Sequence, residues 1–119
     1  MTVPTKPNVD EATRQTLYGV STGDLDLLEE GLQARQEWQQ ESGLDPRSYS
    51  LVKIATLVAL DAPPASYLWQ VANALDSGAT PSEIVGVLRA IAPQVGGPRC
   101  IAAAPEIMVA LGLSLPEGA

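Results

Sequence analysis

The sequence of 119 residues contains no histidine and only one cysteine, Cys100. Histidine is the commonest general base and the commonest zinc ligand, so its absence removes every Ser/His and Cys/His nucleophile pair. A single cysteine can form neither an internal disulfide nor the thiol pair of a dithiol redox site. We therefore expect no metal, no cofactor and no thiol chemistry within one chain.

Aromatic residues make up only 4% of the chain, and phenylalanine is absent. Apolar residues still reach 45%, so a core has to be built from Leu, Val, Ile and Ala, which suits closely packed helices. A chain of this length is one domain by size. We expect residues 1–119 to form a single helical domain whose ends, residues 1–7 and 113–119, are flexible.

Basic residues are scarce, with seven Lys and Arg against fourteen Asp and Glu and a net charge of −7. Phosphate binding needs a basic patch, so this balance argues against nucleic acid and against an anionic membrane surface. No window reaches the roughly 18 continuous apolar residues of a membrane span, and the amino end has no apolar signal core. We expect a cytoplasmic protein.

Proline and its neighbours mark the start of three consecutive helices between residues 44 and 97. Asp45 is placed as an N-cap before Pro46, and Asp61 repeats that arrangement before Pro63 and Pro64. A capping box from Thr80 to Glu83 follows a glycine suited to a C-cap. The predicted helices span residues 46–60, 64–77 and 81–95, the second and third forming a tight antiparallel hairpin.

Hydrophobic periodicity assigns a face to each of these helices. The helix over 46–60 is apolar on nearly all sides, so we expect it to be central and mostly buried. In the helix over 64–77 the predicted core side carries Ala65, Leu68, Val71, Ala72 and Leu75.

Weaker signals predict helices on both flanks. A capping box at Asn8 and Glu11 starts a short helix that stops at Gly19, and a longer one runs from Asp24 to Ser42. A last helix follows Pro98 and runs to about residue 111, and the proline at 105 is expected to kink or split it. No strand pattern competes, which predicts an all-α bundle of about six helices with a central antiparallel hairpin.

Two segments resemble the carboxymuconolactone decarboxylase and alkylhydroperoxidase D-like superfamily. They are Leu44-Asp45-Pro46-Arg47 before an apolar helix, and the run ALDSGATPSEIV over residues 74–85, followed by Ala92-Pro93. The resemblance implies the alkylhydroperoxidase D-like helical fold. It also implies a homotrimer or homohexamer whose active site lies where the central helices of the protomers meet.

The residues that carry that family's chemistry are missing here. The peroxidase branch has a Cys-x-x-Cys-x-x-x-His motif, which would fall on Pro63, Ser66 and Gln70, and a glutamate that would fall on Ser50. These side chains form neither a thiolate nor a sulfenic acid. An amide also does not titrate near neutral pH, so the histidine role that the decarboxylase branch keeps at Gln70 is in doubt. The resemblance thus implies a degenerate active site without thiol peroxidase activity.

Candidate ligand-binding residues follow from the pattern and from the resemblance: Ser50, Lys53, Ser66, Tyr67, Trp69, Gln70 and Arg99. An ammonium inside so apolar a run either faces a cavity that holds an anion, pairs across a subunit interface, or snorkels to a rim. All three readings of Lys53 stay open. A Ser/Lys nucleophile pair at Ser50 and Lys53 rests on a spacing that many helices meet by chance.

The other candidates also have plainer interpretations. Ser66 and Gln70 belong either to a pocket or to a solvated polar stripe that continues through Asn73 and Ser77. Arg99 either helps a helix start to hold a carboxylate or is an exposed arginine where a helix begins. Cys100 is expected to be a small buried hydrophobe.

Three functions remain open at this point, and the catalytic residues are unknown. The first is binding of a small organic, anionic molecule at a subunit interface. The second is a cofactor-independent enzyme of decarboxylase, lyase or isomerase type, acting on a small organic acid or lactone through Lys53, Tyr49 or Tyr67. The third is a structural or assembly protein.

Overall fold

A computed structural model of the chain describes residues 6–23 and 29–115. These residues form the helices α1 (Glu11–Ser21), α2 (Glu29–Ser42), α3 (Pro46–Leu60), α4 (Pro64–Asp76), α5 (Pro81–Val95) and α6 (Gly97–Ala110). No strand occurs in the two described ranges, so the all-α prediction is confirmed there. Most of the two ends expected to be flexible, residues 1–5 and 116–119, lies outside them.

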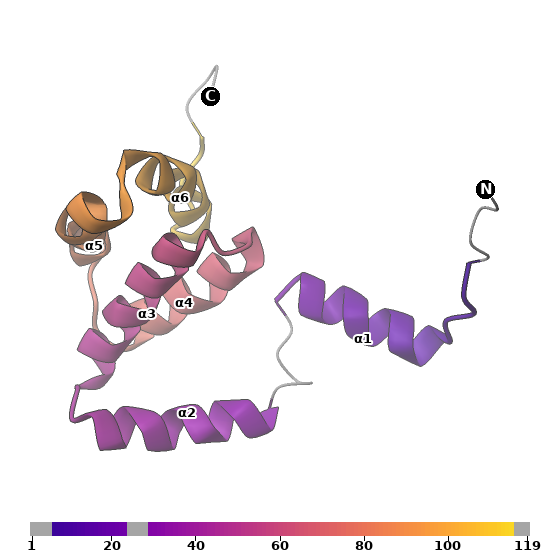
Figure 1. Ribbon diagram of the computed structural model, residues 1–119. Coiled ribbons are helices and arrows are strands. Elements are labelled where there is room, and N and C mark those ends of the chain that lie inside the picture. Colours follow the sequence, from indigo (N-terminus) through magenta and orange to yellow (C-terminus); the bar gives the residue numbers. More distant parts are fainter. Residues whose placement is uncertain (1–5, 24–28, 116–119) are drawn as a thin grey trace.

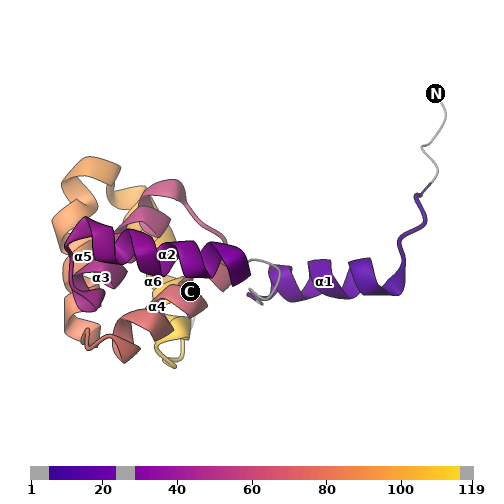
Figure 2. The ribbon, with the colours of Figure 1, turned by 90° about the horizontal axis from the view of Figure 1, so that it is seen from below.

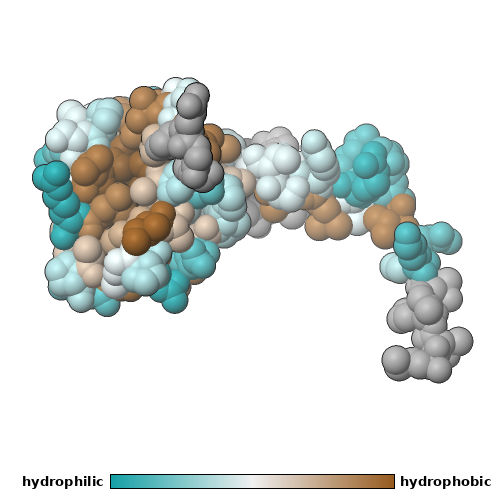
Figure 3. Space-filling model, turned by 90° about the horizontal axis from the view of Figure 1, so that it is seen from above, coloured by the Kyte–Doolittle hydropathy of each residue, from teal (hydrophilic) through white to brown (hydrophobic). Residues whose placement is uncertain are grey.

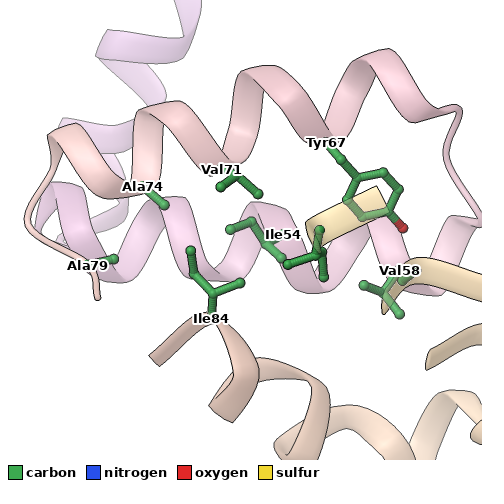
Figure 4. Close-up of a cluster of buried hydrophobic side chains, with 9 residues drawn as sticks. Ile54, Val58, Tyr67, Val71, Ala74, Ala79 and Ile84 are labelled. Carbon is green, nitrogen blue, oxygen red and sulfur yellow. The ribbon is translucent and has the colours of Figure 1, made fainter. Parts of the chain in front are cut away.

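α3 is the central helix of the bundle (Figure 1). It packs against α4, α5 and α6, and α6 also contacts α4 and α5. The core cluster contains one aromatic ring, in line with the low aromatic content of the chain; its members are Ile54, Val58, Tyr67, Val71, Ala74, Ala79, Ile84, Ala103 and Ile107 (Figure 4).

The capping signals confirm two of the three predicted helix starts. The Asp45 side chain accepts a hydrogen bond from the backbone N–H of Ser48 at 2.8 Å. In the capping box of α5, Thr80 accepts from the N–H of Glu83 at 3.1 Å, and Glu83 accepts from the N–H of Thr80 at 3.0 Å. These bonds satisfy backbone donors that a helix leaves unpaired in its first turn.

The predicted N-cap of α4 is wrong, and so is the predicted pair of helices in the hairpin. Asp61 has a φ of 52° and is the C-cap of α3, while the N-cap of α4 is Pro63, which makes no side-chain cap. The pair that packs side by side after a short turn is α3 and α4, because α5 turns away from α4 and packs on α3 and α6. The central hairpin exists, but one helix earlier than predicted.

The flanking helices also differ from the prediction. Asp10, not Asn8, caps α1, because its carboxylate accepts from the N–H of Thr13 at 2.7 Å, and the helix passes Gly19 and ends at Ser21. The start predicted for the second helix lies outside the described residues. α6 runs through its proline at 105 as one helix, so the proline does not split it, and Ala103 and Ile107 on either side are buried.

α1 projects away from the four-helix body in both ribbon views (Figures 1 and 2). Its attachment is tight at one point. Gly23 has a φ of +99°, and a Cβ added to it would lie 2.5 Å from Nε1 of Trp69. Only glycine fits this contact, which fixes the end of the α1 segment beside the start of α4. None of the described helices has the length and apolar character that crossing a bilayer requires.

Candidate functional site

Gln70 lies in the middle of α4 with only 8% of its surface exposed. Its Oε1 is buried and has no hydrogen-bond partner among the described residues. Most buried polar groups in folded proteins are hydrogen-bonded, and an orphaned acceptor costs about 1–3 kcal/mol. An uncompensated amide at this position therefore points to a missing donor.

The burial of Gln70 corrects the predicted faces of α4. The residues of α4 that enter the core are Tyr67, Gln70, Val71 and Ala74. Of the five residues predicted for the core side only Val71 is fully buried, and Leu68 and Leu75 are 46% and 39% exposed. The polar stripe is not fully solvated either, because Gln70 is buried and Ser66, Asn73 and Ser77 are half-buried.

α4 buries a different side from the one that periodicity predicts, because of the helices that pack against it. α4 packs between α3 and α6, so its core side must face both. Tyr67 then brings its large ring into the cluster, which buries more surface than a leucine facing outward would gain. Three of the five residues that periodicity places in the core, Leu68, Ala72 and Leu75, are thereby left at the surface.

Ser50 is the matching buried polar residue on α3, with 6% of its surface exposed. It shares the inward side of α3 with Ile54 and Val58. The two positions where the family resemblance expects a glutamate and a histidine thus hold buried neutral side chains on two helices that pack together.

Lys53 is half-buried on the same helix, and its Nζ lies 4.9 Å from the centroid of the Tyr49 ring one turn earlier. A cation over a ring at such a distance gains about 0.5–1 kcal/mol when partly exposed. The helix is central as predicted, but not mostly buried, since Val52 and Leu60 are 52% and 72% exposed.

Tyr67 is 2% exposed, and its phenol is perturbed by its surroundings. Burial, followed by the negative charges of Asp61 and Glu106, raises the pKa of Tyr67 above its ordinary value of 10.0. The hydroxyl is protonated at neutral pH, as an unperturbed phenol also is, so it can donate a hydrogen bond there but cannot act as a base. Sequence reasoning missed both acids, because only the fold brings α6 and the end of α3 near this ring.

The raised pKa predicts a loss of stability in alkali. Above pH 10 the unfolded chain releases the phenolic proton while the folded chain retains it, so the free energy of unfolding falls as pH rises. Below pH 10 the group contributes no pH dependence. Tyr67→Phe should flatten the alkaline limb relative to the wild type in urea unfolding followed by circular dichroism. Parallel pH profiles for the two proteins would show that the phenol titrates alike in both states.

The remaining candidates lie at different depths. Ser66 is half-buried one turn before Gln70, and Trp69 is 39% exposed beside it. Arg99 is exposed near the start of α6. Cys100 is half-buried, not fully buried as expected, with its Sγ 3.9 Å from the carbonyl oxygen of Leu88. The structure thus gathers the candidates on α3 and α4, with Arg99 on α6.

An ion pair that the sequence analysis did not predict links the first turns of α3 and α5. Arg47 at the start of α3 pairs with Glu83, the same residue that completes the capping box of α5. The pair belongs to the packing of α3 on α5, and both residues are partly exposed.

Comparison with known proteins tests the family assignment. Residues 26–107 match the sequence profile of the carboxymuconolactone decarboxylase family. Neither the curated proteins nor the solved structures include a significant match to this chain. The profile covers more than half of the chain and spans α3, α4 and α5 completely, so the protein belongs to the carboxymuconolactone decarboxylase family.

Proposed function

We propose that the protein binds a small organic acid that also carries a hydrogen-bond donor, at a site around Gln70 on α4. The observation that carries the proposal is the buried Oε1 of Gln70 without a partner. A bound hydroxyl would supply the donor that the protein does not, and so recover the cost of burying the amide oxygen.

Lys53 supports the anionic part of the proposal. It is half-buried on α3, which packs directly against α4, and it directly precedes Ile54 of the core. The chain has only seven basic residues, and elsewhere in the site the charges of Asp61 and Glu106 are negative. A carboxylate would therefore be held on the Lys53 side and a hydroxyl at Gln70.

Self-association would complete this site. One protomer leaves many large apolar side chains exposed, and brown apolar residues gather on the face of the body seen in Figure 3. Apolar surface of this kind is typical of protein interfaces. We propose a homotrimer or homohexamer, with the site at the contact between protomers.

Three probe compounds test the contributions of the carboxylate and the hydroxyl of the proposed ligand separately. In calorimetric titrations 4-hydroxybenzoate offers both groups, benzoate lacks the hydroxyl, and phenol lacks the carboxylate. We expect 4-hydroxybenzoate to bind best, Gln70→Leu to weaken it about tenfold, which corresponds to about 1.4 kcal/mol, and Lys53→Met to weaken benzoate as well.

The matched control is Gln94→Leu, which removes an exposed amide from α5. It should leave all three titrations unchanged. No binding of any probe by the wild type, or equal binding by Gln70→Leu, would overturn the proposal and favour a structural or assembly role.

A cofactor-independent enzyme is the second candidate, in which the phenol of Tyr67, three residues before Gln70 on α4, is the proton donor. In a decarboxylation the bond to the carboxylate carbon breaks, carbon dioxide leaves, and the carbanion takes up a proton, which Tyr67 could donate. The test is carbon dioxide release from carboxymuconolactone. Release that Tyr67→Phe abolishes would establish it, and release at the uncatalysed rate would exclude this substrate.

A further inference from the structure

The outward side of α4 carries an apolar stripe that no other helix of the described residues covers. Leu68, Trp69 and Leu75 are between 39% and 46% exposed, and Ala72 between them is exposed too. No charged residue occurs in α4 before Asp76, so covering this stripe would desolvate no charge along it. We call these four residues the α4 stripe.

α1 buries no side chain fully against the other described helices, and its Leu17 is 60% exposed. An isolated helix of 11 residues is marginal in water, because helices shorter than about 12–15 residues rarely hold without tertiary contacts. The sequence of α1 therefore implies that something packs on it in the assembled protein.

The two sides of α1 differ in character. Glu11 bonds Arg14 at 2.6 Å and accepts from Gln15 at 3.2 Å, which satisfies the polar side within the helix itself. Leu17 lies opposite Gln15 on the helix, and the half-buried Val20 is its apolar neighbour one turn later. Figure 3 shows separate brown patches on one edge of the projecting segment and white to teal side chains on the opposite edge.

The contact between Gly23 and Trp69 limits which surfaces α1 can reach. The contact of Gly23 with Trp69 holds the end of the α1 segment at the amino end of the α4 stripe, but α1 then leads away from its own body (Figures 1 and 2). The radius of gyration is 17.2 Å, against about 13.5 Å for a compact chain of this length. At 1.5 Å per residue α1 is about 16 Å long, and the stripe from Leu68 to Leu75 is about 10 Å, so the helix can cover it.

We propose that α1 is an exchanged arm, whose Leu17 side packs on the α4 stripe of a second copy of the chain. This rests on the self-association in the proposed function but does not require a ligand. Exchange would bury the Leu17 side of α1 and the α4 stripe against each other. It also places an element of one copy beside the helix that carries Gln70 of the other.

Cysteine cross-linking tests the contact in the full-length chain. Leu17→Cys and Ala72→Cys are made in separate proteins, each with Cys100→Ser, and one carries a mass tag. The two are mixed, unfolded, refolded together and oxidised. We expect a covalent pair that contains one tagged and one untagged chain on a non-reducing gel, and no such pair when Gln15→Cys replaces Leu17→Cys.

The alternative outcomes each overturn the proposal. A cross-link that forms only when both cysteines are in one chain, at the mass of a single chain, would mean that α1 folds back on its own body. Pairing of Ala72→Cys chains alone would mean that the α4 stripes face each other. No cross-link in any mixture, with assembly intact by light scattering, would exclude the arm while leaving the proposed function standing.

An assembly measurement that needs no cysteine gives a second readout. Leu17→Asp should lower the mass found by light scattering, because a carboxylate would then enter the apolar contact, whereas Gln15→Asp on the other side should not. Equal masses for Leu17→Asp and the wild type would contradict the exchange.

Discussion

Ile54→Ala is expected to lower the free energy of unfolding by about 2–5 kcal/mol, the cost typical of emptying a fully buried aliphatic position. Ile54 is 0% exposed and lies at the centre of the cluster to which α3, α4, α5 and α6 all contribute. A cluster with a single aromatic ring has few large side chains to close around the cavity. Because total stabilities are about 5–15 kcal/mol, this one change removes a large share.

Urea unfolding followed by circular dichroism measures the effect, at one protein concentration throughout, since assembly makes stability concentration-dependent. Val52→Ala is the matched control on the same helix, and its side chain is 52% exposed. We expect the control to cost less than about 1 kcal/mol. Equal losses for the two variants would contradict the burial that separates the sides of α3.

Gln70→Leu is expected to raise the free energy of unfolding by about 1–3 kcal/mol in the absence of ligand. Leucine has nearly the volume of glutamine and lacks the buried Oε1 that has no partner. Most substitutions in a core destabilise, so a gain of this size would be unusual. It is the behaviour of a residue kept for binding at the expense of stability.

The same unfolding measurement shows whether the Gln70 amide serves ligand binding or stabilises the fold. Gln94→Leu, at an exposed amide on α5, should change the stability by no more than about 0.5 kcal/mol. A Gln70→Leu protein less stable than the wild type would show that the amide holds the structure together. The titrations with 4-hydroxybenzoate then tell whether the stabilised variant has also lost its ligand.

The sequence by itself determined the elements and the family. Asp45 before a proline and the capping box of Thr80 and Glu83 are local devices, in which side chains bond backbone groups within one turn. Such bonds depend on near neighbours alone, so the bounds of α3 and α5 agree with the prediction. The resemblance over residues 74–85 rests on the same local pattern, and the family profile confirms it.

The tertiary structure decided which sides of the helices are buried. Periodicity placed Leu68, Ala72 and Leu75 in the core and Gln70 outside it, and the fold reverses this, because α4 has to face α3 and α6 together. Burial raises the pKa of Tyr67, and the charges of Asp61 and Glu106 add to this effect; Glu106 comes near the ring only when α6 packs on α4. A sequence states how apolar a helix side is, but which side is covered depends on the positions of all its neighbours.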